Sequence, residues 1–487
     1  MAHARRVPET APGVPDSVVN TDMKTPDIRL SRISKLLIDR TEITTEEALV
    51  RRELYCVTLR CAPDVVQSRT LQVAVLTAAN IANRCFPGAV RIELGPNVAD
   101  TPLLLWPSLH CTFGQALISL LGPDALMDSG RFEHEGRTLI FGNAPPTRGA
   151  LRVTFDGWIA KVGPAANIDA LLQREYCSLS GVLAGALAIS ELFLSFADLN
   201  IEAGRRIVGL SLWRPDLDVN DPAALGVQVE FLPRDFWALG LGHLGNAYLW
   251  SLATLPYLNS GASEIFLNDF DRVEPENVET GLIFNVKDAG SYKTRVCSQW
   301  LEDRGFQTRL IERRFDSSFH CREDEPRMAL CGFDSNPARR HLATAQFLQV
   351  MESGLGGTTD NFDTISFHTF PNPRRAEELW PDLSPEEQAR QREQRERVAR
   401  ENPAYAQLGN DQCGRAELAG KSVAVPFVGA AAATLVVAEA IRLLHGGPAY
   451  ADIKLVLSDL GRRHASMTRN YGARDLAGLN YSDACVT

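Results

Sequence analysis

The segment of residues 239–245, LGLGHLG, constrains the fold of this chain more than any other stretch. Three glycines in it have the spacing G-x-G-x-x-G after a short apolar run: Gly240, Gly242 and Gly245. Asp269 and Asp271 follow where a second parallel strand would end. Glycines let the backbone approach phosphates, the next helix offers free N–H groups, and an acidic residue reaches the ribose. The pattern predicts a nucleotide bound on a strand–turn–helix unit.

Length and composition limit the class of protein. At 487 residues the chain is too long for one ordinary hydrophobic core, so we expect several domains. The content of 45% hydrophobic and 23% charged residues is typical of a soluble globular protein. A net charge of -10 argues against a nucleic-acid partner. The sequence contains no uninterrupted run of about eighteen apolar residues, so no membrane-spanning helix is predicted.

The N-terminus and the cysteines bear on the compartment and on metals. The first residues, MAHARRV, lack the apolar stretch of a signal peptide, which predicts a cytoplasmic location. Residues 1–30 show no periodicity, and we expect a flexible leader there. The 10 cysteines contain no C-x-x-C pair, and the 9 histidines form no H-E-x-x-H cluster. Structural zinc, a disulfide framework and a histidine-bound catalytic metal are therefore not expected.

Helical and strand-like patterns alternate along the chain, which predicts α/β domains at residues 31–230 and 231–487. In the first we expect helical residues 29–59, a strand at 71–76, a helix at 78–84, strands at 91–94, 150–155 and 157–162, and a long helix at 180–197. In the second we expect strands at 264–267, 328–331 and 364–368, and a solvated helix at 384–401. The charged pattern of that last helix favours ion pairs one turn apart.

The two halves contain similar helices of small residues. Gly181–Glu191 and Gly429–Glu439 each begin with a glycine and end with a glutamate, near the close of an α/β unit. We therefore expect a duplicated domain, with two Rossmann-like folds in tandem. The expected turn of the first copy, Thr77–Ala82, contains no glycine. That copy is predicted to be degenerate and unable to hold phosphates.

Further polar motifs follow the glycine turn in a fixed order. They are Glu276–Phe284 (ENVETGLIF), Asp288–Lys293 (DAGSYK) and Asp334–Arg339 (DSNPAR). Together with the turn, they resemble the adenylation domain of the ubiquitin-activating, ThiF and MoeB superfamily. The resemblance spans residues 230 to 460 and depends on the order and spacing of the elements.

The resemblance implies that the cofactors are ATP and Mg²⁺. The implied cofactor-binding residues are the three turn glycines, Asp269 and Asp271 for the ribose, Asn277 for a phosphate, Lys293 and Arg339. Lys293 would counter the charge of the departing pyrophosphate, and Asp334 would hold the metal. Taken singly, Lys293 can also be a surface lysine and Asp334 a helix N-cap.

The chain departs from the family where Thr280 replaces an arginine. The family's arginine-bearing element that reaches across from a partner subunit is also missing in its usual form. Arg51 and Arg52 are the nearest candidates to supply that charge, with a plain solvated pair as the alternative.

Cys413 lies in the polar stretch 409–417, GNDQCGRAE, before the closing helix. Thioester-forming members of the superfamily carry a nucleophilic cysteine in this crossover, here residues 370–420. A polar loop gives access, and Arg415 would favour the thiolate. The alternative is an incidental thiol. Cys331, at a strand end, is expected to serve packing.

The resemblance therefore implies an activating enzyme for a ubiquitin-like protein, pseudo-dimeric within one chain and similar to bacterial enzymes of antiphage ubiquitin-like conjugation systems. It would adenylate the C-terminal carboxylate of its partner, form a thioester on Cys413 and transfer it to a conjugating enzyme. A sulfur-carrier-protein adenylyltransferase without a thioester, an NAD-binding Rossmann oxidoreductase and a non-enzymatic scaffold remain as alternatives.

Overall fold

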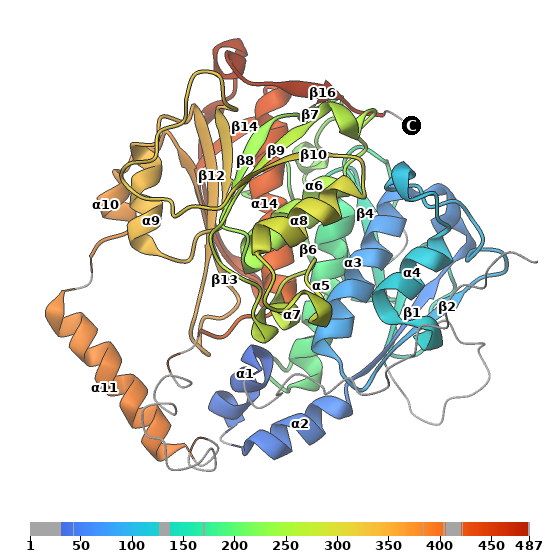
Figure 1. The fold of residues 1–487 in the computed structure, drawn as a ribbon. Coiled ribbons are helices and arrows are strands. Elements are labelled where there is room, and N and C mark those ends of the chain that lie inside the picture. Colours follow the sequence, from blue (N-terminus) through green and yellow to red (C-terminus); the bar gives the residue numbers. More distant parts are fainter. Residues whose placement is uncertain are drawn as a thin grey trace, which may run out of the picture.

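Two β-sheets with helices between and around them make up the protein (Figure 1). The computed structural model describes residues 31–41, 43–125, 137–168, 171–382, 384–402, 405, 420 and 422–485. We call the part built on the six-stranded sheet the first lobe and the part built on the eight-stranded sheet the second lobe.

The first lobe contains a sheet of order β2-β1-β3-β4-β5-β6, parallel up to β4 and antiparallel from there. Its strands are β1 Cys56–Cys61, β2 Ala89–Leu94, β3 Arg137–Phe141, β4 Leu151–Asp156, β5 Ile159–Pro164 and β6 Val208–Ser211. Its helices are α1 Arg32–Thr41, α2 Thr45–Glu53, α3 Arg69–Cys85, α4 Phe113–Leu121 and α5 Leu179–Phe196.

The second lobe contains a sheet of order β10-β9-β8-β11-β12-β13-β14-β15, parallel up to β12. Its strands are β8 Phe236–Leu239, β9 Glu264–Asn268, β10 Gln307–Ile311, β11 Met328–Cys331, β12 Gln349–Leu355, β13 Thr364–Phe370, β14 Pro448–Val456 and β15 Asp459–Asn470. Strands β7 Phe231–Pro233 and β16 Tyr481–Asp483 form a separate pair. Its helices are α6 His243–Ala253, α7 Pro275–Thr280, α8 Lys293–Glu302, α9 Asn336–Arg340, α10 Ala376–Leu379, α11 Pro385–Glu401 and α14 Pro426–Leu444. Short 3-10 helices lie at Pro63–Gln67, Pro107–Leu109, Pro123–Ala125, Pro222–Leu225, Ser260–Ala262, Val286–Asp288, His341–Ala343 and Ala473–Leu476.

The two sheets repeat one topology. The order β2-β1-β3-β4-β5-β6 in the first lobe corresponds to β9-β8-β11-β12-β13-β14 in the second. In each lobe a hairpin is followed by a long apolar helix, α5 or α14, and then by the next strand. This confirms the predicted α/β class with two Rossmann-like folds in tandem. The predicted domain bounds themselves stay predictions.

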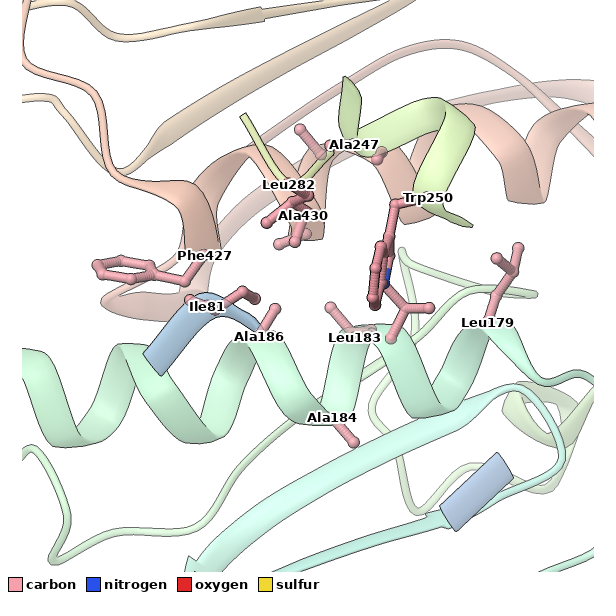
Figure 2. Close-up of a cluster of buried hydrophobic side chains, with 14 of the residues drawn as sticks. Ile81, Leu179, Leu183, Ala184, Ala186, Ala247, Trp250, Leu282, Phe427 and Ala430 are labelled. Atoms are coloured by element: carbon pink, nitrogen blue, oxygen red, sulfur yellow. The ribbon is translucent and has the colours of Figure 1, made fainter. Parts of the chain in front are cut away.

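Helices of both lobes pack together between the sheets. Figure 2 shows Trp250 of α6 and Ala430 of α14 directed toward α5, beside Leu183 and Ala186. The Trp250 indole N–H donates to Thr77 Oγ1 of α3 at 3.1 Å, so the contact between lobes is also polar. The residues named here are buried, and the lobes therefore share one continuous core.

The small residues of α5 are required by its contact with α3. A Cβ on Gly181 would lie 2.3 Å from the carbonyl oxygen of Thr70. This close approach explains the glycine that was noted in the sequence. By length and composition, α5 and α14 could each cross a membrane, but 89% and 100% of their apolar windows are buried inside the protein. They are core helices of this structure.

Each long helix contains, in its C-terminal half, a buried glutamate that binds the chain following the helix. Glu191 in α5 accepts from the Gly204 N–H at 2.8 Å and from Arg206 at 2.9 Å. Glu439 in α14 accepts from the Tyr450 N–H at 3.1 Å and also pairs with Arg442. The glutamates that end the two similar sequence segments thus have the same structural role.

Two predictions in the first lobe were wrong. Residues 71–76 are not a strand but part of α3, because Ser68 caps the helix through the Leu71 N–H and the whole segment is buried on all sides. The helical region predicted for 29–59 ends at Glu53, and Cys56 begins β1. Apolar periodicity alone does not separate a short buried strand from a buried helix. The predicted helix at 384–401 is confirmed as the exposed α11, with ion pairs such as Arg392–Glu396 at 3.0 Å.

Candidate nucleotide site

The carboxyl ends of three parallel strands meet where the strand order reverses. The chain leaves β8 toward β9 on one side and later returns to β11 on the other. Leu239, Asn268 and Cys331 end these strands and are register partners. In open α/β sheets, ligands bind in the crevice outside such a switch point. The glycine turn, Asp269 and Asp334 directly follow these three strand ends.

The turn from β8 to α6 requires glycine at two positions for the fold. Gly240 has a φ of +76°, and its N–H donates to the Asn268 carbonyl at 2.9 Å. A Cβ on Gly245 would lie 2.0 Å from the carbonyl oxygen of Gly240. Gly242 differs, because a Cβ there would meet nothing within 4 Å. Gly242 therefore leaves bare backbone beside open space at the N-terminus of α6, as phosphate binding requires.

Replacing Gly245 by alanine should damage the turn itself. We expect ATP affinity to fall by about tenfold or more and the melting temperature to drop, since overpacking against backbone costs ~1–3 kcal/mol. Gly242→Ala is the matched control: it should melt like the wild type yet bind ATP more weakly, because its methyl group enters the phosphate space. Calorimetric titration and thermal melting measure both. A Gly242→Ala protein with wild-type ATP affinity would contradict this placement of the phosphates.

The two aspartates that follow β9 have different surroundings. Asp269 is buried and accepts from the Leu241 N–H at 2.7 Å and the Asp271 N–H at 2.8 Å. Burial raises its pKa, although Lys293 opposes this shift. Asp269 therefore fixes the backbone of the glycine turn at Leu241. Asp271 has a half-exposed side chain and is the aspartate better placed to meet a ribose.

Lys293 is not a free surface lysine. It is the first residue of α8, its side chain is only 11% exposed, and its Nζ lies 3.1 Å from Asp271 Oδ2. Its backbone N–H donates to the Asp271 carbonyl at 3.0 Å. Lysine and aspartate are thus fixed to each other at the edge of the crevice, where an anionic ligand would compete for the ammonium group.

Asp334 and Arg339 flank the end of β11. The N-cap of α9 is Ser335, so the alternative of Asp334 as an N-cap is wrong. No hydrogen bond or ion pair with another described residue involves the exposed Asp334 carboxylate. Arg339 Nε donates to the Phe333 carbonyl at 2.8 Å and lies 3.6 Å from Glu352 Oε2. Arg339 is thereby held against β12, with its guanidinium partly engaged.

The geometry near Asp334 fits a magnesium ion that is shared with phosphates. Within the described ranges there is no group of three or more His, Cys, Asp and Glu side chains that could hold a metal alone. Mg²⁺ commonly takes one or two carboxylates and completes its shell with phosphate oxygens and water. The exposed Asp334 carboxylate, at the same end of the sheet as the glycine turn, meets the carboxylate part of that requirement.

The segment around α7 contains the remaining predicted residue. Asn277 Oδ1 accepts from the Glu274 N–H at 3.0 Å as part of the helix cap. Its amide NH2 remains the group suited to a phosphate, so that role stays a prediction. Thr280, which replaces the family arginine, is buried.

His243 packs on Gly429 of α14, and burial lowers its pKa to about 3, so the imidazole is neutral.

Arginines of the first lobe reach α7, where the family arginine is missing. Arg52 is buried and lies 3.1 Å from Glu279 Oε1, so its charge is already matched. Arg84 of α3 donates to the Gly281 carbonyl at 3.0 Å and to the Phe284 carbonyl at 3.1 Å, and burial lowers its pKa to about 10. The sequence points to Arg52 as a candidate but not to Arg84. No local pattern marks a contact between α3 and the distant segment that follows α7.

The corresponding turn of the first lobe is filled by a side chain. It runs through residues 62–68 between β1 and α3, rather than through Thr77–Ala82 as predicted, and it also lacks glycine. Glu175 accepts from the Thr70 N–H at 3.1 Å and the Thr70 hydroxyl at 2.5 Å. It also accepts from the Ser68 hydroxyl. The Glu175 side chain thus lies at the N-terminus of α3, where phosphates would lie in a functional copy, which supports the prediction that this copy is degenerate.

Cys56, Cys111 and Cys485 are partly exposed, and the other cysteines are buried, among the described residues. Cys413 and Arg415 lie outside them, so the nucleophile stays a prediction. Cys331 is fully buried, and burial raises the pKa of its thiol far above the usual range, as expected for a packing residue.

A separate cavity of about 510 Å³ lies beside α8 and is lined by Arg272, Tyr292 and Trp300 among others. It contains neither the glycine turn nor Asp334.

Comparisons with known proteins agree with this architecture. The family model described as the BilD N-terminal domain matches residues 56–212, and the BilD C-terminal domain matches residues 232–447. A bacterial E1-like protein BilD from Collimonas sp. (strain OK412) is 34% identical over 428 residues, which covers 86% of this chain and 90% of that protein.

Solved structures give more distant matches. E. coli MccB with ATP has a TM-score of 0.34 and 14% identity, covering 67% of this chain and 97% of that one. E. coli tRNA N6-threonylcarbamoyladenosine dehydratase, TcdA, has a TM-score of 0.28 and 15% identity, covering 44% and 86%. The resemblance to the ubiquitin-activating, ThiF and MoeB superfamily is nevertheless confirmed by the family models and the curated relative, and the chain belongs to the BilD family of bacterial E1-like proteins.

Proposed function

We propose that this protein uses ATP to adenylate the C-terminal carboxylate of a ubiquitin-like protein. One observation carries the proposal: in an E1-like chain, bare backbone at Gly242, the Lys293–Asp271 pair and the unengaged carboxylate of Asp334 follow adjacent strand ends at one switch point. Each group answers a need of carboxylate activation, namely a phosphate cradle, a cation and a metal ligand.

In the first step, a carboxylate oxygen of the partner protein bonds to the α-phosphorus, and the bond from that phosphorus to the bridging oxygen of the β-phosphate breaks. Pyrophosphate leaves with the bonding electron pair. Lys293 then exchanges its contact with Asp271 for the departing phosphates, whose growing charge it compensates. A bound Mg²⁺ would be held by Asp334 and would supply further positive charge there.

In the second step of the proposal, the Cys413 thiolate attacks the acyl carbon, and AMP leaves. The thiol proton passes to solvent, and the thioester is then available to a conjugating enzyme. Sequence alone supports this step, since Cys413 follows α11 and precedes α14 in the crossover. Its thiolate would be favoured by a nearby cation such as Arg415.

ATP–pyrophosphate exchange in the presence of the candidate ubiquitin-like protein tests the first step. We expect exchange in the wild type and in Cys413→Ala, because adenylation does not need the thiol. An adduct sensitive to reducing agent should form in the wild type and be lost in Cys413→Ala, whereas Cys485→Ala should keep it. Absence of both ATP binding and exchange would refute the proposed function.

The same experiment separates the alternatives. A sulfur-carrier-protein adenylyltransferase would show exchange but never the adduct. The NAD-binding oxidoreductase is not retained, because membership of an E1-like family accounts for the order of motifs after the glycine turn.

A further inference from the structure

The first lobe binds the loop that connects α7 to α8 through its carbonyl groups. Arg84 donates to the Gly281 and Phe284 carbonyls at 3.0 and 3.1 Å. Asn80, one turn earlier on α3, donates from Nδ2 to the Leu282 carbonyl at 2.9 Å. Three carbonyls of one short loop in the second lobe are therefore fixed by one helix of the first.

The same loop continues the contact toward the glycine turn. The Ile283 N–H donates to Asn246 Oδ1 at 3.0 Å. Asn246 Nδ2 donates in turn to the Leu241 carbonyl at 2.8 Å and to the Gly242 carbonyl at 3.2 Å. Because its oxygen faces an N–H and its nitrogen faces two carbonyls, the orientation of this amide is determined by its neighbours.

Burial makes this series of hydrogen bonds demanding. Asn80, Leu282, Ile283 and Asn246 are almost fully inaccessible to solvent. A buried polar group that loses its partner is left without water to replace it. Displacing the loop would therefore leave Asn246 Oδ1 without its donor and would loosen the amide that binds the Leu241 and Gly242 carbonyls.

The glycine turn is thus held from two directions. Asp269 binds the Leu241 N–H from within the second lobe. Asn246 binds the Leu241 carbonyl and is itself positioned by the loop that α3 holds. A backbone hydrogen bond from the Gly240 N–H to the Asn268 carbonyl also holds the turn, and these two side chains add the hydrogen bonds of Leu241.

We propose that Asn80 and Arg84 of the degenerate lobe are positioning residues for the nucleotide site. They act through a relay that runs from the 281–284 loop to Asn246 and the glycine turn. The inference rests on the proposed nucleotide site and assigns the first lobe a role in it. In this view the lobe that lost its own phosphate turn is retained as the support for the other.

Amide hydrogen exchange in the full chain without nucleotide tests the relay directly. In Asn80→Ala we expect exchange to quicken about tenfold both in the 281–285 segment and in the 239–246 segment, as for the loss of one buried hydrogen bond. ATP should also bind about tenfold more weakly, with little change in the maximal exchange rate of pyrophosphate.

A second asparagine on α3, exposed and directed within the first lobe, provides a control. Asn83 Nδ2 donates to the Leu120 carbonyl at 3.0 Å, within the first lobe. Asn83→Ala should leave exchange at 239–246 unchanged. If both variants loosen the glycine turn equally, the effect is general destabilisation and the relay is overturned.

Two more variants keep the test decisive if Asn80→Ala folds poorly. Arg84→Lys retains the charge but cannot reach both carbonyls, so it should loosen the turn to an intermediate degree. Asn246→Ala should reproduce the effect at 239–246, and an unchanged turn in that variant overturns the relay. A wild type that binds no ATP would instead count against the proposed function, because the exchange measurement needs no nucleotide.

Discussion

Substitution of Lys293 by alanine is expected to lower the rate of ATP–pyrophosphate exchange by about 10²–10³-fold, the usual cost of removing one preorganised group that stabilises developing charge. Lys293 is held at the crevice by Asp271 and by its place at the start of α8. Without the ammonium group, the carboxylates of Asp269 and Asp271 remain and repel the phosphates. The loss should therefore exceed that of a neutral contact.

Lys287→Ala is the control for this experiment. Lys287 is an exposed lysine of the loop that leads to α8, outside the crevice. Exchange measured at saturating partner should be unchanged in this variant. Lys293→Arg keeps the charge but not the geometry and should recover part of the rate. Exchange at the wild-type rate in Lys293→Ala would remove Lys293 from the site.

The largest loss of stability is expected for Glu439→Ala, at about 3–5 kcal/mol in the free energy of unfolding, the usual cost of leaving a buried charge without its partner. Glu439 and Arg442 are both 0% exposed. Glu439 also accepts from the Tyr471 hydroxyl at 2.6 Å. Alanine would leave the arginine unpaired in the core and free two donors at once.

The corresponding glutamate of the first lobe calibrates this measurement. Glu191 is nearly as buried, but its partner Arg206 is 21% exposed and can regain water. Glu191→Ala should therefore destabilise less than Glu439→Ala in denaturant unfolding followed by circular dichroism. Equal losses would show that burial of the partner is not what sets the cost. Arg442→Met combined with Glu439→Gln should recover part of the stability, since it removes both charges.

Much of the fold could be predicted because several of its elements have recognisable local sequence patterns. The glycine turn, the acidic strand end of β9 and the apolar helices α5 and α14 each have a signature within a few residues. The run at 71–76 misled because a fully buried helix and a buried strand are equally apolar. The Ser68 cap that decides for a helix lies before the run.

The site was predictable as a set of motifs but not as a network. Asn80, Arg84 and Asn246 carry no motif, and their partners lie in segments distant in the sequence. Asp269 accepts from backbone N–H groups, and Ser335 is the N-cap of α9. Both features depend on the exact direction in which the chain leaves the strand ends. The functional roles assigned to all of the candidate site residues, Cys413 included, remain predictions.

The Glu175 side chain, bound at the N-terminus of α3, has a consequence for stoichiometry. A duplicated nucleotide-binding fold would ordinarily offer two equivalent nucleotide sites, which ligands approach from two directions. Here the Glu175 side chain occupies one of them, held by Ser68 and Thr70. The two copies therefore differ both in the glycines of the turn and in this side chain, and one nucleotide is expected to bind per polypeptide, without competition between the halves of the chain.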